Sequence, residues 1–237
     1  MEKMKNNMLL DLKNKNSIKI EKYFSDKDTY IRQKAYLIIG KIYKEHSHLK
    51  KVIIEILNEL FTSCNEKIRQ TVVYACGEIG KIDPPEIMDL LERALNEDNK
   101  SVRNAVVGSL KRIGEKNPNF IFKIAKKYLH HPDPRIRKQI IHGLELHGRT
   151  HPEEILPFLK ELQNDKDKNV IKMMIHVLGQ ISYKKGCLEK VVDNLSKWNN
   201  KNLVKKAIEE IIKVHDRYQK FSEKNAEEAR MYIGKIL

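Results

Sequence analysis

Apolar residues recur along this chain at two spacings, one short and one long. Within six stretches they lie three or four residues apart, the spacing of one face of an α-helix. Each stretch opens with an Asp or Asn, and the apolar residue three places later is Ile31, Ile68, Val102, Ile136, Val170 or Leu203. Successive members of this set are separated by 37, 34, 34, 34 and 33 residues. A nearly constant period of this length predicts a stack of repeated units.

Each stretch predicts one long amphipathic helix, which we call helix B. With the apolar residue as position 0, positions 4, 8 and 11 share its helical face and are apolar in every repeat, except for His147 at position 11 of the fourth. The Asp or Asn suits the N-cap, because its side-chain oxygen accepts hydrogen bonds from free backbone N–H groups. After three of the helices we expect glycine C-caps with positive φ, at Gly80, Gly114 and Gly148.

Shorter amphipathic segments separate the B helices, and we call each of them helix A. Three of them begin beside a proline, which favours the first turn of a helix, at Pro84, Pro118 and Pro152. No competing alternation typical of strands occurs. The predicted A helices cover residues 16–25, 50–62, 85–96, 119–130, 153–164 and 187–198.

A helical pair of this kind cannot bury its apolar faces alone, but stacked pairs build one continuous core. The predicted fold class is therefore all-α, a right-handed α-solenoid of about six helical hairpins. We expect the repeats to occupy residues 16–218. Residues 1–15 should form an N-terminal cap, and residues 219–237 should form a C-terminal capping helix.

Four repeats share an Asx-x-x-(Ile/Val)-Arg step, in the segments Asp28–Arg32, Asn65–Arg69, Asn99–Arg103 and Asp133–Arg137. With the stripe that follows, this step resembles the HEAT-repeat family over residues 16–218, and the hairpins are therefore HEAT-like. Ile171 and Val204 stand where the resemblance implies arginine. The arginines could form a ladder of phosphate-binding groups, but the resemblance favours a structural ladder in which each pairs with the adjoining inter-helix turn. Its members are Arg32, Arg69, Arg103 and Arg137.

The net charge of the chain suggests which class of molecule it binds. The 237 residues contain 46 Lys and Arg against 32 Asp and Glu, a formal net charge of +14. Residues 101–150 alone carry +8, whereas residues 51–100 carry −4. A concentrated basic surface on a curved scaffold suits a polyanion. The alternative is that the abundant lysine merely reflects the codon bias of the organism.

The binding surface should be the face of the B helices that is turned away from the core, at positions 2, 6, 9 and 13. In HEAT-like stacks these helices line the concave side. Glycines at Gly40, Gly77, Gly108 and Gly179 could admit a partner closely or let neighbouring helices pack. The candidate nucleic-acid-binding residues on or beside this face are Lys44, Lys81, Lys111, Arg112, Lys138, His142, Arg149, Lys172 and His176.

Other kinds of chemistry find little support. No nucleotide-binding, zinc-protease or nucleophile motif occurs, so we assign no catalytic residue, no metal site and no cofactor. His147 and His151 are four residues apart, which is a ligand spacing, but Gly148 and Pro152 suggest that the helix ends between them. His130 and His131 should lie in an inter-helix turn with Pro132. No apolar stretch reaches the roughly 18–20 residues of a membrane span, so we expect no membrane partner. The cysteines are three and widely separated, which suits a reducing, cytoplasmic environment.

The leading hypothesis is a non-catalytic scaffold whose basic concave face binds nucleic acid, DNA in preference to RNA, through the backbone. The second hypothesis is a scaffold for an acidic or amphipathic protein. The third rests on residues 136–182, which resemble the bacterial alkylpurine DNA glycosylases of the DNA alkylation repair family. That resemblance implies groove tryptophans and an aspartate, but Trp198 is the sole tryptophan and lies in a predicted A helix, so a site would have to use Tyr74, Tyr183 or His142. The sequence leaves the oligomeric state open.

Overall fold

A computed structural model describes residues 2–237, which form helices and turns and no strand. The predicted all-α solenoid of HEAT-like hairpins is confirmed. The helices group into two compact units that divide between Asn117 and Pro118, and each is described by itself.

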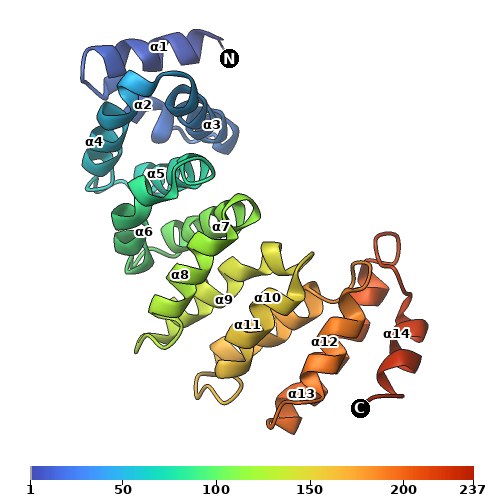
Figure 1. The fold of residues 1–237 in the computed structure, drawn as a ribbon. Coiled ribbons are helices and arrows are strands. Elements are labelled where there is room, and N and C mark those ends of the chain that lie inside the picture. Colours follow the sequence, from blue (N-terminus) through green and yellow to red (C-terminus); the bar gives the residue numbers. More distant parts are fainter. Residues whose placement is uncertain (1) are drawn as a thin grey trace. The chain divides into compact units, whose positions relative to one another are not determined.

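The first unit contains three A helices and three B helices behind an N-terminal helix. In Figure 1, α3, α5 and α7 follow one another along one side of this unit, and α2, α4 and α6 lie along the other. Its helices are α1 (Glu2–Lys13), α2 (Ile18–Phe24), α3 (Thr29–Glu45), α4 (Lys50–Leu60), α5 (Glu66–Ile79), α6 (Met88–Leu95) and α7 (Lys100–Lys116). Short 3-10 turns at Ser47–Leu49 and Pro84–Ile87 precede α4 and α6.

The second unit repeats this pattern with α9, α11 and α13 as its B helices (Figure 1). Its helices are α8 (Pro118–Tyr128), α9 (Pro134–Gly148), α10 (Pro152–Glu161), α11 (Lys168–Gln180), α12 (Cys187–Leu195), α13 (Lys201–Arg217) and α14 (Ala226–Ile233). Helix α14 packs against α13, in the segment expected to cap the C-terminus.

Helix α1 lies in the segment expected to cap the N-terminus and packs against α2 and α3. Its Asp11 is 3% exposed, and the carboxylate accepts hydrogen bonds from the backbone N–H groups of Lys19 (2.6 Å) and Ile20 (3.0 Å). These N–H groups lie in the first turn of α2 and have no partner within that helix. The first helix therefore caps the start of the second.

The core consists of the predicted apolar stripe. Its residues in all six repeats are buried, apart from the half-buried Ile31. His147, the polar exception, is buried too, because its ring packs edge-on against Phe122 and stacks on His151 at 4.8 Å. Its Nε2 lies 2.8 Å from a carboxylate oxygen of Glu154. A hydrogen bond therefore satisfies the one polar group in the stripe.

The N-terminal signals act as expected. In all six B helices the predicted Asp or Asn is the N-cap, and its side chain accepts at least one backbone hydrogen bond from the first turn. Pro118 and Pro152 are the first residues of α8 and α10, and Pro84 opens the 3-10 turn before α6.

The prediction of positive-φ glycine C-caps was wrong. Gly80 caps α5 with φ −65°, Gly114 lies inside α7, and Gly148 is the last residue of α9. Close packing explains two of them: a Cβ on Gly80 would lie 2.6 Å from Cδ1 of Ile113, and one on Gly148 would collide with the side chain of Ile155. These glycines admit a neighbouring helix and do not reverse the chain.

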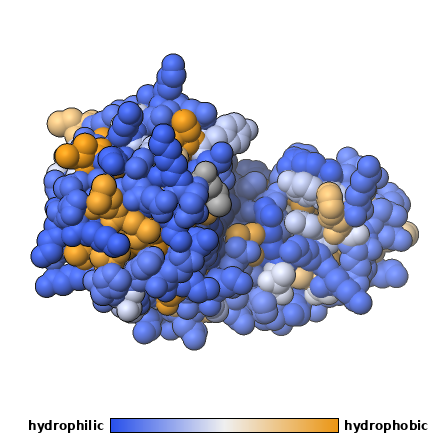
Figure 2. Space-filling view, turned by 90° about the horizontal axis from the view of Figure 1, so that it is seen from above, coloured by the Kyte–Doolittle hydropathy of each residue, from blue (hydrophilic) through white to orange (hydrophobic). Residues whose placement is uncertain are grey.

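The surface is mostly polar, and hydrophilic residues cover most of the face shown in Figure 2. No helix among residues 2–237 is both long and apolar enough to cross a membrane. All three cysteines are free: Cys64 is exposed, whereas Cys76 and Cys187 are buried.

Candidate functional site on the B helices

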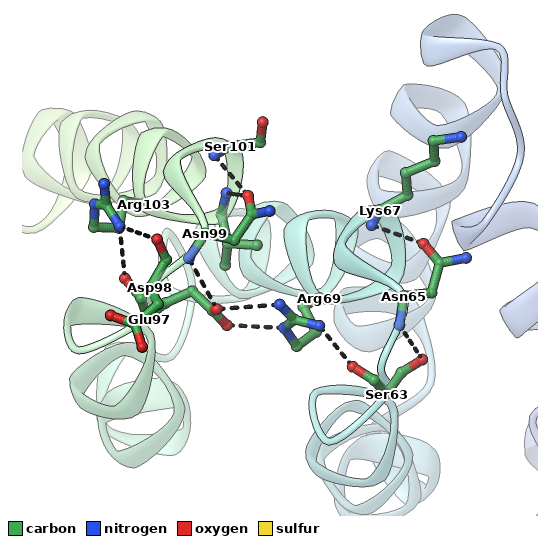
Figure 3. Close-up of polar contacts among 10 residues, drawn as sticks. Ser63, Asn65, Lys67, Arg69, Glu97, Asp98, Asn99, Ser101 and Arg103 are labelled. Carbon is green, nitrogen blue, oxygen red and sulfur yellow. Dashed lines mark hydrogen bonds and ion pairs between the residues drawn. The ribbon is translucent and has the colours of Figure 1, made fainter.

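The arginine ladder is directed at the chain's own loops. Arg69 binds both carboxylate oxygens of Glu97 at 2.8 and 3.1 Å and donates to the carbonyl oxygen of Ser63 at 2.8 Å (Figure 3). The hydrogen bonds from Arg69 lower the pKa of Glu97, and Glu97 in turn raises the pKa of Arg69. Because Glu97 precedes α7, this ion pair links two successive repeats.

Arg137 repeats the arrangement in the second unit. It binds Asp165 through two hydrogen bonds of 2.7 and 2.8 Å, and its Nη1 donates to the carbonyl oxygens of His131 and Pro132. Burial favours the neutral acid, but the hydrogen bonds from Arg137 and from the backbone of Asp167 outweigh it and lower the pKa of Asp165.

The other two ladder arginines bind carbonyl oxygens of their own loops. Arg103 Nη1 donates to the carbonyl oxygens of Glu97 (3.0 Å) and Asp98 (Figure 3), and Arg32 Nη1 donates to that of Asp26 at 2.6 Å. All four guanidinium groups are thus directed at loop atoms of the chain itself.

Three of the four groove glycines allow close contact between B helices. A Cβ on Gly40 would lie 2.6 Å from Cβ of Glu78, one on Gly77 would lie 2.7 Å from Oγ of Ser109, and one on Gly179 would lie 2.8 Å from Cγ of Glu210. Gly108 differs, because its Cβ would meet only Tyr74, at 3.3 Å. The close contacts account for three of the glycines as packing residues.

In the first unit, side chains from α3, α5 and α7 form an aromatic and cationic cluster. The rings of Tyr36 and Tyr74 lie 5.2 Å apart, and the guanidinium of Arg112 lies 5.3 and 5.2 Å from their centroids. Arg112 also approaches the buried carboxylate of Glu78 at 3.3 Å, and Lys81 pairs with the same carboxylate. Two predicted groove cations therefore neutralise one buried acid.

In the second unit, a row of lysines crosses the B helices. Lys138, Lys172 and Lys205 each occupy position 2, on α9, α11 and α13, and each is exposed. One turn further along, His142 and His176 lie in contact at position 6, with ring centroids 5.8 Å apart. Equal positions on α9 and α11 are therefore neighbours, which places Lys138 beside Lys172.

Further along α9 than Lys138, the side chain of Glu145 is buried, with 1% exposure, and several polar groups surround its carboxylate. Arg149 donates to Oε1 at 2.6 Å and to the side-chain oxygen of Gln180 at 2.8 Å. The Nε2 atoms of His142 and His176 lie 3.2 and 3.4 Å from Oε2. Three predicted site residues, His142, His176 and Arg149, are thus brought together around an acid.

Two candidates remain, Lys44 and Lys111. Lys44 is exposed near the end of α3, and Lys111 is half-buried on α7. Two site residues were not predicted from the sequence: Glu78, on which the first cluster depends, and Lys205, the third lysine of the row. Lys205 has position 2 of the sixth repeat, so the same count would have found it. Glu78 has no comparable signal, because a glutamate in a helix is ordinarily exposed.

Two of the aromatic residues considered for the glycosylase hypothesis are buried in the second unit. Trp198 is completely buried just after α12, and its Nε1 donates to the side chain of Asn194 at 2.8 Å. Tyr183 is buried and stacks on Tyr218 at 5.2 Å. Burial raises the pKa of Tyr74, which lies under Arg112.

Known structures share this fold. AlkD2 from Streptococcus mutans matches 80% of this chain and 94% of its own, with a TM-score of 0.60 and 18% identity. The protein smu.31 from Streptococcus mutans UA159 matches 79% of this chain and 97% of its own, with a TM-score of 0.58 and 17% identity. At this identity, both likenesses show the fold alone.

Importin beta also matches, over 83% of this chain but 30% of its own length, with a TM-score of 0.50 and 12% identity. No curated protein matches the sequence. A family model described as HEAT repeats matches residues 53–119 and 122–212, which together make up more than half of the chain. The chain belongs to the HEAT-repeat family.

Proposed function

We propose that the protein is a non-catalytic HEAT-repeat scaffold that binds nucleic acid, and DNA in particular, through the phosphate backbone. The observation that carries the proposal is the lysine row, Lys138, Lys172 and Lys205, at one position of three successive B helices. In the first unit the same position holds neutral side chains, namely Gln33, Gln70 and Asn104. We therefore assign the binding surface to the second unit.

The row has the charge and spacing to meet a polyanion. Packed helices lie about 8–10 Å apart, so three lysines span about 20 Å. Duplex DNA presents one phosphate for about every 1.7 Å of its axis, so each lysine can reach a phosphate without base contacts. No ion pair within residues 2–237 is described for Lys138 or Lys172. Glu209 lies one turn beyond Lys205, which confines the row to the N-terminal part of the B helices.

The charge of the second unit supports the same partner. Residues 118–237 contain 24 Lys and Arg against 15 Asp and Glu, a net charge of +9. Lysine is a compact, strongly hydrated charge without a fixed fork geometry, so it neutralises phosphate with little sequence discrimination. We expect binding that is sensitive to salt and indifferent to sequence.

The test is the affinity of the full chain for a fluorescent DNA duplex, measured by anisotropy between 50 and 200 mM salt. Three phosphate contacts give a slope of about −2.7 in log affinity against log salt. The variant Lys138→Glu, Lys172→Glu, Lys205→Glu should abolish most of this slope and weaken binding at low salt. The matched control, Lys123→Glu, Lys126→Glu, Lys197→Glu, makes the same change in charge on exposed lysines at the A helices.

If the two triple variants lost equal amounts of affinity for DNA, only net charge would matter, and this result would contradict the proposed binding surface. Indifference to DNA, together with binding of an acidic protein that the first variant abolishes, would favour a protein-binding scaffold. A single-stranded RNA of equal length distinguishes the two nucleic acids, because the proposal expects the duplex DNA to bind more tightly.

A further inference from the structure

The cluster on α9 and α11 presents three ligand atoms of the kind that transition metals bind. They come from His142, His176 and Glu145, each of which offers one atom, and these atoms all lie within 4.8 Å of one another. His142 and Glu145 are three residues apart on α9 and so share a helical face, while His176 comes from the neighbouring helix. The set is two imidazoles and one carboxylate, ligands that suit zinc and related divalent ions.

The distances within the cluster fit ligands around a metal better than they fit direct hydrogen bonds. A charge-assisted N–H···O bond is about 2.7–2.9 Å long, whereas the two histidine nitrogens lie 3.2 and 3.4 Å from the carboxylate oxygen. Around a metal with bonds of about 2.0–2.1 Å, tetrahedral ligands lie about 3.3–3.4 Å apart. Two of the three separations therefore have this length already.

The third separation, between the two histidines, is at most 4.8 Å. To reach the tetrahedral value it must shorten by at most about 1.5 Å. The side chain of His176 is 41% exposed and that of His142 is 29% exposed, so a rotation of either ring can close this distance. The same exposure gives an ion a path to the buried carboxylate.

Two further side chains, Arg149 and Gln180, hold the carboxylate of Glu145 in position. Arg149 binds the other carboxylate oxygen of Glu145, and Gln180 holds Arg149 in turn. This arrangement orients Oε2 toward the two histidines, as outer partners orient ligands in metal sites. Arg149 contacts Oε1 of Glu145, whereas both histidines approach Oε2.

We propose that His142, His176 and Glu145 bind one divalent transition-metal ion of the zinc class. The three protein ligands leave at least one coordination position toward solvent, as in sites where the ion also holds a water molecule or an external ligand. An all-oxygen set would suit magnesium or calcium, and the two imidazoles exclude that assignment. The proposal is independent of the lysine row, since it concerns different side chains.

The experiment uses the full chain without a polyhistidine tag, freed of metal with a chelator and titrated with zinc against a chromophoric competitor. One equivalent should bind per chain. His176→Ala should weaken binding by more than about tenfold, because even the loss of an outer-shell partner costs that much. The matched control is His130→Ala, which removes an exposed histidine whose Nε2 lies 2.8 Å from a carboxylate oxygen of Glu161 in the same unit.

A second measurement uses cobalt as a spectroscopic probe of the ligand set. Cobalt bound to the wild-type chain should give the intense visible absorption of a four- or five-coordinate ion with nitrogen ligands, and zinc should bleach it. The double variant His142→Ala, His176→Ala, checked for folding by circular dichroism, should give no such spectrum. No bound zinc in the wild type, or equal zinc binding in the double variant, would overturn the proposal.

Discussion

Arg137 offers the sharpest test of what holds the repeats together. Its guanidinium makes four hydrogen bonds, two to Asp165 in the loop before the next B helix and two to carbonyl oxygens of its own loop. The side chain of Arg137 is 14% exposed and that of Asp165 is 4% exposed. Arg137→Ala therefore leaves a nearly buried carboxylate without its counter-ion.

The cost follows from this burial. Removing one partner of a buried ion pair destabilises a protein by about 3–5 kcal/mol. Asp165 keeps the hydrogen bond from the backbone N–H of Asp167 at 2.8 Å, so we expect the lower end, about 3 kcal/mol. The matched control is Arg135→Ala, two residues earlier. Arg135 is 54% exposed and pairs with Asp133 at 2.8 Å, and an exposed pair of this kind contributes about 0–1 kcal/mol.

The assay is urea unfolding of the wild type and the two variants, followed by circular dichroism at neutral and at acid pH. The pKa of Asp165 is lowered in the folded protein, so its contribution is complete above the unfolded value of about 3.9. It is lost as the pH falls through the folded pKa. The gap between wild type and Arg137→Ala should therefore narrow below about pH 4. Equal costs for Arg137→Ala and Arg135→Ala, or a gap independent of pH, would refute the reasoning.

Two further predictions test packing and thiol chemistry. Gly77→Ala should destabilise the protein by about 1–3 kcal/mol, because its Cβ would lie 2.7 Å from Oγ of Ser109. Gly108→Ala should instead raise or preserve the free energy of unfolding. Thermal melting of both variants tests this, and a lower melting temperature for Gly108→Ala than for Gly77→Ala would contradict the packing role of Gly77. Burial raises the pKa of Cys76 to about 12, so iodoacetamide should label the exposed Cys64 but not Cys76 in the native chain. Mass spectrometry of tryptic peptides measures the labelling, and rapid labelling of Cys76 would contradict its burial.

The repeating part of the fold could be predicted because each repeat carries its own local signals. The N-cap residue, the stripe at positions 0, 4, 8 and 11 and the proline before helix A act within one hairpin, so the count along the chain finds them. The glycines were interpreted less well, since a glycine at a helix end suits a positive φ and a close helix contact equally. Ile113 beside Gly80 decides between the two, and that contact lies outside the hairpin.

The candidate sites depend on such contacts between hairpins. The lysine row needs only one helical position counted in successive repeats, and two of its three members, Lys138 and Lys172, were predicted in this way. The cluster around Glu145 also needs the register between α9 and α11, the burial of the glutamate and the direction of Arg149. A basic composition predicted cations on this face but gave no sign that a buried acid lies among them.

Within residues 2–237, each unit buries one glutamate on a B helix, and the side chains that cover it determine what that glutamate can do. Glu78 lies under Arg112 and Lys81, and neither a guanidinium nor an ammonium has a lone pair to offer. Over Glu145, an arginine covers one oxygen and two histidines face the other. A neutral imidazole does have a lone pair, so the second arrangement can accept a cation whereas the first can only repel one. A change from permanent cations to histidines is therefore sufficient to turn a structural ion pair into a ligand set on an otherwise unchanged scaffold.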